Sequence, residues 1–471
     1  MSLVALLRRS LTSLLAAAAL VPVGAQSTDG LPPAAREVRD ETLRTWNAYL
    51  EHAWPHDNLL PLSRSWRDWY DEPLGISPID NYSTLRVMGL DREAERVLRY
   101  VVDSSDFAVD KYVKVFEVNI RVLGGLLAMY EWSGDPAVLA RAVDFADRLL
   151  PAFDSPTGLP YYDVNLATGA VRGDTINVAE AGSYLVEWGL LSYYTADSTY
   201  YQAAKRATEA VFARRAPTTG LLGRDLDVTT GEWTVREAMV GAYVDSYFEY
   251  LVKAHELFGD EDVRRMWEAH RADIDRHFPD TVDGGRAVWY PRLDMDTGEL
   301  LGRDVRLWDA YFPGLLVLSG DTATARLAQN AWHGYWERYD GLGIDYDYGA
   351  DTLINPYFQL NPEVIESNYY LWLATGDSTY YRRAAGYWAD FQERARTPVA
   401  YAHLADVRTG ELDDELATFF IAETLKYFYL TFGGNDAVSP ATHVFNTEAH
   451  PFARTSFERG EAARRLGFGV E

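Results

Sequence analysis

The chain has 471 residues and no cysteine, so disulfide bonds cannot stabilise it and a large hydrophobic core must do so. Its formal net charge of −26 argues against nucleic acid or an anionic membrane as a partner and is compatible with a neutral substrate. Aromatic residues make up 14% of the chain, which suits either sugar-stacking surfaces or a large helical core.

The first 25 residues have the pattern of an export signal. Arg8 and Arg9 precede an apolar run at residues 11–23, and the small residues at 23–25 offer a cleavage site. The run is too short to span a bilayer comfortably. We therefore expect a signal peptide at residues 1–25, export to the periplasm or extracellular space, and no membrane association of the mature chain.

A helix-boundary element recurs through the chain. In each copy Gly or Ala is followed by Asp, and the copies end at Asp135, Asp197, Asp260, Asp321 and Asp377. Each copy ends one apolar helical pattern and begins another, because Gly suits the position after a helix and Asp suits an N-cap. The period is too long for the common solenoid repeats.

A second recurring element, Thr-Gly at 168–169, 230–231, 297–298 and 409–410, predicts tight turns between short extended segments. Each unit is then a helix, a turn, a second helix and a hairpin. Six or seven such helical pairs would close into an (α/α) barrel. Because no Pro-, Gly- or Ser-rich linker follows residue 30, we expect residues 26–471 to form one catalytic domain.

Two pairs of polar residues depart from the apolar core pattern. Glu117 and Arg121 lie four residues apart on one face of a mostly apolar helix, and Asp245 and Glu249 show the same spacing near the start of a later helix. Both pairs are candidates for a site. A buried ion pair would also explain the first pair, and a helix N-cap would also explain Asp245.

A third candidate stretch contains Asn361, Pro362, Glu363 and Glu366. The pattern predicts Asn361 as N-cap and Pro362 as the first helical residue, which places Glu363 in the first turn, where the helix dipole favours its ionised form. That suits a general base or a charge stabiliser, and ordinary placement of acids in a first turn is the alternative. Glu366 lies on the same face.

A fourth stretch contains Phe419 and Glu423, which share a helix face. They could combine a ring that stacks on a sugar with a carboxylate that binds hydroxyl groups, although a core ring beside a solvated acid has the same pattern. Carboxylates gathered at one mouth of a barrel would have divergent pKa values, which separates a general acid from a general base. The residues alone thus predict a glycosidase-like site without a substrate.

A polar cluster at 446–450 follows the last aromatic helix. The hydroxyl and carbonyl oxygens of Thr447, beside carboxylates, suit a hard cation such as calcium. The segment Val444-Phe-Asn-Thr-Glu-Ala-His-Pro451 resembles the C-terminal signature of glycoside hydrolase family 47, the class I α-mannosidases. Further segments resemble this family in the same order across most of the chain, namely 79–85, 116–128, 159–166, 179–180, 245–251, 362–367 and 422–427.

The resemblance implies an all-α fold, an (α/α)7 barrel with short β-hairpins at one end and a C-terminal segment that enters the barrel. It also implies a calcium-dependent, inverting exo-α-mannosidase that hydrolyses α-1,2-linked mannose from high-mannose glycans or oligosaccharides. We expect an exported, bacterial-type member that acts as a monomer on a mannose-containing glycan. Inversion implies catalytic carboxyl groups about 6.5–9.5 Å apart.

Roles for single residues follow from the resemblance. Glu117 resembles the general acid, Glu363 the general base and Asp245 a third essential carboxylate; whether Glu117 or Asp245 protonates the leaving group stays open. Thr447 resembles the sole direct protein ligand of Ca²⁺. Four other carboxylates resemble residues that hold waters or sugar hydroxyls, namely Glu180, Glu366, Glu423 and Glu448. Phe419 resembles the ring under the reacting sugar, and Arg121 resembles the partner that orients Glu117.

Four positions depart from the family pattern. Tyr243 and Asn361 stand where Arg is usual, Ser83 where Asp is usual and Leu307 where His is usual. The two arginines normally contact substrate, and a tyrosine cannot replace a charged fork. Linkage and branch preference are therefore open.

Three alternatives accompany this interpretation. One is an inverting glycosidase of the same fold with an altered linkage or sugar preference, and another is a weakly active mannose-glycan-binding protein. The third, a sugar epimerase on an (α/α)6 barrel, would use His as acid and base. Of the 9 histidines, His450 alone falls in the candidate stretches, beside the metal segment.

Overall fold

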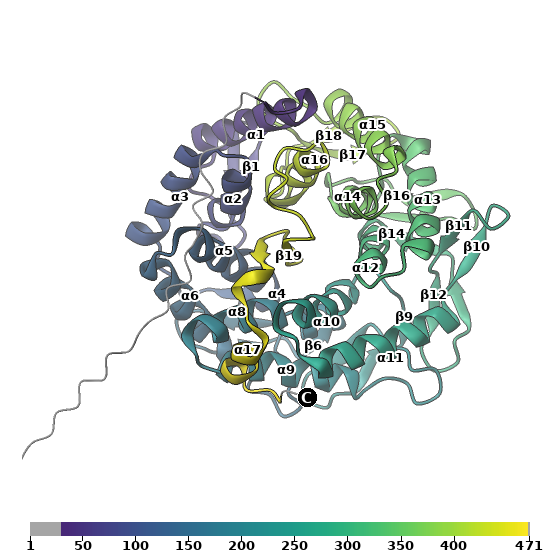
Figure 1. The fold of residues 1–471 in the computed structure, drawn as a ribbon, viewed down its shortest axis with the longest axis horizontal. Helices are drawn as coiled ribbons and strands as arrows, with labels where there is room; N and C mark the ends of the chain where they lie inside the picture. The colour runs from purple at the N-terminus through teal and green to yellow at the C-terminus, as the bar shows by residue number, and fades with distance from the viewer. Residues whose placement is uncertain (1–29, 470–471) are drawn as a thin grey trace, which may run out of the picture.

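The computed structural model describes residues 30–469, so the predicted signal peptide at 1–25 lies outside the described residues. Within 30–469, two concentric rings of helices form a barrel (Figure 1). The outer ring contains α1 (Pro33–His52), α3 (Asp91–Ser104), α6 (Pro136–Leu149), α9 (Thr199–Phe212), α11 (Glu261–His277), α13 (Thr322–Tyr339) and α15 (Ser378–Arg394). The inner ring contains α2 (Ile76–Val87), α5 (Gly124–Ser133), α8 (Leu185–Thr195), α10 (Asp245–Phe258), α12 (Phe312–Leu318), α14 (Glu363–Thr375) and α16 (Lys426–Thr431).

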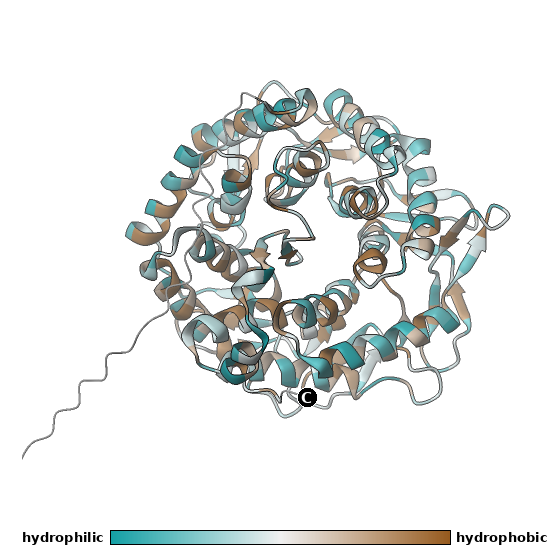
Figure 2. Cartoon of the chain, viewed as in Figure 1, coloured by the Kyte–Doolittle hydropathy of each residue, from teal (hydrophilic) through white to brown (hydrophobic). Residues whose placement is uncertain are grey.

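The chain alternates between the rings, and α1 packs against α16 to close them. This arrangement confirms the predicted (α/α)7 barrel. The hydrophobic pattern explains which helix joins which ring. Outer α3 buries a stripe that includes Ala94, Val97 and Val101, whereas inner α8 is buried continuously from Leu185 to Ser192. An amphipathic helix covers a core with one face, and a helix that is apolar all round is enclosed. Figure 2 shows hydrophilic residues along the outer rim of the barrel.

The recurring Asp residues begin outer helices as predicted. The side chains of Asp135, Asp260, Asp321 and Asp377 each accept a backbone N–H at the start of the following helix. Asp197 is the exception, because Ser198 is the N-cap of α9, although Asp197 still accepts the N–H of Thr199 at 2.9 Å.

The predicted Thr-Gly turns also form, as hairpins with antiparallel pairing. These are β4–β5 (Asp163–Asn165, Val171–Arg172), β7–β8 (Asp225–Asp227, Trp233–Val235), β12–β13 (Arg292–Asp294, Leu300–Gly302) and β17–β18 (His403–Asp406, Glu411–Asp413). A separate hairpin, β1–β2 (Asn58–Leu60, Ser65–Arg67), follows α1. Other short strands are β3 (Tyr112–Lys114), β6 (Thr175–Asn177), β9 (Glu237–Ala238), β10 (Asp280–Val282), β11 (Ala287–Trp289), β14 (Asp304–Arg306), β15 (Asp345–Asp347) and β16 (Thr352–Asn355).

These strands lie in the chain between the end of an outer helix and the beginning of the next inner helix. They therefore gather at the end of the barrel where the inner helices begin, as expected. This end also receives the N-terminal residues of the inner helices, including Asp245 and Glu363. The site residues thus come together because the inner helices share one direction.

The C-terminal segment enters the barrel. Strands β19 (His443–Phe445) and β20 (Pro451–Ala453) form a hairpin whose turn, residues 446–450, lies at the centre of the ring, in yellow in Figure 1. Gly124 on α5 makes room for this turn, because a Cβ there would lie 2.8 Å from Asn446 Nδ2. Helix α17 (Arg459–Leu466) then packs against α8. Within residues 30–469, no helix is both long and apolar enough to cross a membrane.

Candidate active site

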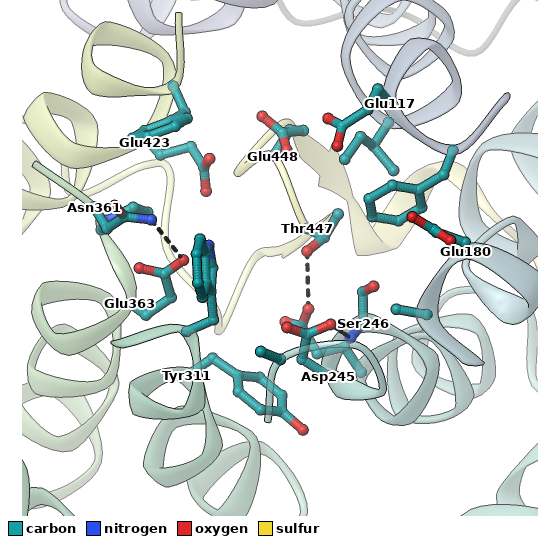
Figure 3. Close-up of a pocket in the computed structure, with 18 of the residues that line it drawn as sticks. Glu117, Glu180, Asp245, Ser246, Tyr311, Asn361, Glu363, Glu423, Thr447 and Glu448 are labelled. Carbon is teal, nitrogen blue, oxygen red and sulfur yellow. Dashed lines mark hydrogen bonds between the residues drawn. The ribbon is translucent and has the colours of Figure 1, made fainter. Parts of the chain in front are cut away.

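A cavity of about 300 Å³ lies inside the barrel, and all of the predicted site residues line it. Figure 3 shows part of this lining, with Asp245, Glu363 and Thr447 among the labelled residues. They are Glu117, Arg121, Glu180, Asp245, Glu363, Glu366, Phe419, Glu423, Thr447 and Glu448. They are spread over the chain from residue 117 to residue 448, so the barrel topology is what brings them together. We refer to this space as the acidic cavity.

The turn at 446–450 places Thr447 in the acidic cavity. Asn446 Oδ1 accepts the N–H groups of Glu448 at 3.1 Å and His450 at 2.8 Å, which closes the turn. Asn446 Nδ2 donates to Glu187 Oε1 on α8 at 2.8 Å and so ties the turn to the inner ring. Thr447 Oγ1 is then directed at α10, where it donates to Glu249 Oε2 at 2.9 Å.

Glu117 is held between two cations. Its carboxylate accepts from Arg121 Nε at 3.2 Å and from Lys114 Nζ at 3.3 Å. Lys114 also pairs with Glu180 at 2.7 Å, and Arg121 also pairs with Glu448. Burial alone would raise the pKa of Glu117, but Arg121 and Lys114 outweigh burial and lower it below its usual value. Glu117 is therefore ionised, and the structure contains the Glu117–Arg121 ion pair that the sequence offered as an alternative.

Asp245 and Glu363 lie in the opposite electrostatic environment. Burial raises the pKa of Asp245 to about 8, with a further contribution from Glu249. Burial also raises the pKa of Glu363 well above its usual range, with contributions from Glu366 and Asp245. The predicted effect of the helix dipole on Glu363 is thus outweighed by burial, which disfavours its ionised form in the protein without ligands.

The helix starts differ from the predicted caps by one residue. Asn361 is not the N-cap of α14: Pro362 holds that position, and its carbonyl accepts the N–H of Glu366 at 2.8 Å. The Asn361 side chain faces Glu363 instead and donates to Oε1 at 3.4 Å, because the backbone turns at Leu360 with a φ of 65°. Asp245 is likewise the first residue of α10 rather than its N-cap.

Three further carboxyl groups line the acidic cavity together with Thr447. Burial raises the pKa of Glu366 to about 7 and that of Glu448 to about 8. It raises the pKa of Glu423 well above its usual range, and the neighbouring Glu448 and Glu363 add to the effect. Lys253 and Arg121 provide positive charge nearby, but the crowded acids still hold protons more tightly than isolated ones. A bound cation would relieve this crowding.

Two segments at the site are π-helical. Arg121 lies in η1 (Asn119–Leu123) and Glu423 in η4 (Phe420–Leu425), where the sequence predicted ordinary helix. A π-helical turn widens the helix locally and is common at functional sites. Phe419 immediately precedes η4, and its ring centroid lies 5.8 Å from the Arg121 guanidinium. The Phe419 ring therefore lies beside the arginine that pairs with Glu117.

Three positions that depart from the family pattern have distinct surroundings in the structure. Tyr243 lines the acidic cavity with a φ of 79°, and the guanidinium groups of Arg224 and Arg306 lie 4.9 and 5.0 Å from its ring centroid. Positive charge is therefore present beside this ring. Ser83 is buried, and its hydroxyl lies 2.9 Å from His450 Nδ1 beneath the C-terminal turn. Leu307 is buried in the core.

Sequence reasoning missed several residues of the site. Lys114, Trp308 and Tyr311 line the acidic cavity, as does Glu249, which was singled out by spacing but not assigned to the site. The position of Lys114 three residues before Glu117 is a signal that could have identified it. Trp308 and Tyr311 sit beside the cavity through tertiary packing alone, so no local pattern indicated them.

The residues present fit a hydrated cation rather than a cage of protein ligands. Thr447 and the surrounding carboxylates offer hard oxygen donors, which calcium prefers. Within residues 30–469, no group of three or more His, Cys, Asp or Glu side chains is arranged to hold a metal ion. A single direct protein ligand, with water completing the shell, is compatible with both observations.

Comparisons with known proteins identify the family. The family model described as "Glycosyl hydrolase family 47" matches residues 41–454. The chain is similar to Alpha-mannosidase I MNS5 of Arabidopsis thaliana, with 33% identity over 88% of this chain and 76% of the relative. It is also similar to the human ER degradation-enhancing alpha-mannosidase-like protein 2, with 32% identity over 91% of this chain and 79% of the relative.

A solved structure agrees with these relatives. The structure of alpha-1,2-mannosidase from Trichoderma reesei superposes with a TM-score of 0.82 at 26% sequence identity, covering 90% of this chain and 99% of that chain. The family match spans most of the chain and all of the predicted site residues. This chain is therefore a glycoside hydrolase and belongs to glycosyl hydrolase family 47.

Proposed function

We propose that this glycoside hydrolase is a calcium-dependent, inverting exo-α-mannosidase that removes α-1,2-linked mannose from high-mannose glycans or oligosaccharides. The observation that supports it most is the meeting of Asp245, Glu363 and Thr447 in one acidic cavity. Hydrolysis with inversion needs one carboxyl group that gives a proton and another that activates water. The name of the Trichoderma relative supports the α-1,2 linkage.

In the proposed reaction, Glu363 removes a proton from the attacking water and Asp245 holds the proton for the leaving group. A pKa of about 8 keeps Asp245 protonated at neutral pH, whereas Arg121 and Lys114 keep Glu117 ionised. This electrostatic difference favours Asp245 as the proton store over Glu117. Glu117 would then accept a hydrogen bond from a sugar hydroxyl or from a water that passes the proton on.

The other residues would bind the reacting sugar. The Phe419 ring would lie beneath it, and Arg121 would hold Glu117 and Glu448 in place through their ion pairs. Thr447 would bind Ca²⁺ directly, while Glu180, Glu366, Glu423 and Glu448 would hold waters or hydroxyl groups. When bound, Ca²⁺ would supply positive charge that favours the ionised form of these carboxyl groups, including Glu363. We further propose that the protein is exported and acts as a monomer.

The proposal is tested by incubating the protein with a high-mannose glycan, with Ca²⁺ and with EDTA, and following released sugar by proton NMR. Early β-mannose that disappears with EDTA is expected. Early α-mannose would contradict inversion, and undiminished release in EDTA would contradict calcium dependence. Binding without release would favour the alternative of a weakly active protein that binds mannose glycans. The human relative, which is named only as alpha-mannosidase-like, motivates that alternative. Release from a different linkage would favour altered specificity at Tyr243 and Asn361.

A further inference from the structure

A chain of four buried polar side chains lies beneath the turn at 446–450. It consists of Lys426, the first residue of α16, Ser83 and Asp80 on α2, and His450 at the end of the turn. Each of the four is fully buried, and none of them lines the acidic cavity. Burial of polar groups costs free energy unless contacts with other polar groups compensate for it, so these side chains must satisfy one another. We refer to these four residues as the buried relay.

The donors of the buried relay point in one direction. Lys426 Nζ donates to the Ala449 carbonyl at 2.5 Å and to Ser83 Oγ at 3.0 Å. Burial lowers the pKa of Lys426 to about 7, so below that pH it is an ammonium group, which has donors but no acceptor. The Ser83 hydroxyl therefore accepts from Lys426 and keeps its own proton for His450 Nδ1, which lies 2.9 Å away. His450 Nδ1 is thus an acceptor.

His450 continues this direction toward Asp80. Burial lowers the pKa of His450, so its ring is neutral and, with Nδ1 accepting, carries its proton on Nε2. Nε2 lies 3.4 Å from Asp80 Oδ1, and within residues 30–469 neither atom has another hydrogen-bond partner. The other oxygen of Asp80 accepts from Thr418 Oγ1 at 2.8 Å and lies 3.7 Å from Arg121 Nη1. The buried relay therefore ends at a carboxylate beside the arginine that pairs with Glu117.

The buried relay also holds the turn that carries Thr447. Ala449 adopts a φ of 56°, a left-handed conformation that costs a non-glycine residue free energy and persists only where the surroundings impose it. The hydrogen bond from Lys426 to the Ala449 carbonyl is one contact that does so. At the other end of the turn, Lys253 on α10 donates to the Asn446 carbonyl at 3.3 Å. Two buried lysines, from α10 and α16, thus hold carbonyl groups on either side of Thr447.

We propose that His450 is a positioning residue for the cation site: with Nδ1 held by Ser83 and the Nε2 proton directed at Asp80, it fixes the turn so that Thr447 is placed to bind the cation. This inference rests on the proposed function, since it takes Thr447 as the ligand of Ca²⁺. A histidine that only filled space would need the size of the ring and not the placement of its proton. The proposal therefore requires one tautomer of His450 and links it to the affinity for the cation.

The first test determines the tautomer. Nitrogen NMR of protein labelled at histidine, recorded below about pH 7, should show a His450 ring that is protonated at Nε2 and not at Nδ1. The signal that His450→Gln lacks identifies the ring. Ser83→Ala removes the hydroxyl that donates to Nδ1 and should release the ring to a mixture of tautomers. A His450 ring protonated at Nδ1 in the unmodified protein would overturn the proposal.

The second test measures Ca²⁺ affinity by calorimetry in two variants of His450. In His450→Gln the amide nitrogen can reach the position of Nε2 and donate to Asp80, so Kd should stay close to the unmodified value. In His450→Asn the shorter amide reaches only the position of Nδ1, and Kd should rise about tenfold, because a contact that orients a ligand is lost. His270→Asn is the matched control and should leave Kd unchanged, because His270 is also buried and contacts Tyr247 but does not line the acidic cavity.

Ser83→Ala is a milder variant that decides the proposal even if His450→Asn fails to fold. It removes a single buried oxygen atom from the relay and should raise the Kd for Ca²⁺ severalfold. Equal Kd values in His450→Gln and His450→Asn, or an unchanged Kd in Ser83→Ala, would overturn this inference and leave the proposed function standing. If the unmodified protein bound no Ca²⁺, the proposed calcium dependence would fail together with this inference.

Discussion

Glu117 and Glu363 show how the surroundings of a carboxyl group decide its chemistry. Both are glutamates that line one cavity, yet Lys114 and Arg121 lower the pKa of the first, and burial among acids raises that of the second. Residue type and spacing alone do not distinguish them. What distinguishes them is the charge beside each. Lys114 and Arg121, from the same segment of chain, flank Glu117, whereas the acids Glu366 and Asp245 lie near Glu363. In the proposed reaction, bound Ca²⁺ would then be needed to ionise Glu363.

Replacing the proposed base tests this division. In Glu363→Gln, kcat should fall by at least about 10²-fold, because a neutral amide cannot accept a proton from water. Glycan affinity measured by calorimetry should be retained, since the side chain keeps its size and hydrogen-bonding capacity. Glu337→Gln, at an exposed position on α13, is the control. Joint loss of affinity and turnover would show that Glu363 is structural.

The raised pKa of Asp245 makes a prediction about stability. In the unfolded chain this carboxyl loses its proton near pH 4, but in the folded protein it keeps the proton up to about pH 8. Between these values the folded state binds more protons than the unfolded state, so its free energy of unfolding falls as the pH rises. The fall is complete above about pH 8.

Asp245→Asn should therefore flatten the decline between pH 5 and pH 8 in denaturant titrations of the calcium-free protein, while catalysis is lost. Asp103→Asn, at an exposed position on α3, should leave the slope unchanged. An Asp245→Asn variant as pH-dependent as the unmodified protein would mean that Asp245 titrates normally in the folded state.

At the scale of helices and hairpins, most of the fold could be predicted from the sequence. Boundary residues such as Gly134 and Asp135 act locally, so the turn between two helices is visible in a few residues. The π-helical turns at Arg121 and Glu423 could not be predicted, because tertiary packing rather than propensity selects them.

The candidate site could likewise be predicted only in part from the sequence. All of the predicted residues line one cavity, because the family resemblance identified them by segment. Their protonation was harder to predict: the dipole argument for Glu363 considers one helix, whereas burial results from the whole barrel. The N-cap assigned to Asn361 was wrong by one residue, which is typical of helix boundaries inferred from sequence.

The fit of the C-terminal turn against α5 can be tested at Gly124. A Cβ at this position would lie 2.8 Å from Asn446 Nδ2 and 3.1 Å from His450 Cδ2, so Gly124→Ala should displace the turn that carries Thr447. Overpacking of this kind typically costs about 1–3 kcal/mol, measurable as a lower free energy of unfolding by urea titration. Turnover should fall with it, since Thr447 moves with the turn.

Gly386→Ala supplies the control for Gly124→Ala. Gly386 lies in α15, and a Cβ added there would meet no atom within 4 Å, so this change should be neutral or slightly stabilising. Equal losses in the two variants would indicate a general effect of glycine replacement. If Gly124→Ala lowered neither the free energy of unfolding nor turnover, the turn would accommodate the added Cβ without disturbing the site.

At the scale of the whole molecule, the barrel is closed around a C-terminal segment that connects distant helices. The turn at 446–450 contacts α8 through Glu187 and α10 through Glu249, and Arg121 reaches it from η1. A ligand bound at the tip of this segment therefore couples several inner helices. Binding of this ligand should therefore raise the free energy of unfolding of the entire barrel rather than cause only a local change.

Calcium should consequently raise the melting temperature of the protein. A ligand that binds only the folded state stabilises it by about 2.7 kcal/mol at a concentration one hundred times its Kd. The cavity that Thr447 lines also contains Glu366, Glu423 and Glu448, and a bound cation would favour their ionised forms. Calorimetric melting in Ca²⁺ and in EDTA should differ by a few degrees, and Thr447→Val should abolish the difference and weaken activity by about tenfold or more. Thr455→Val, at an exposed threonine just beyond β20, should keep the shift. A calcium shift that persists in Thr447→Val would place the ion elsewhere, and the carboxyl groups around Thr447 would then need another source of positive charge to ionise.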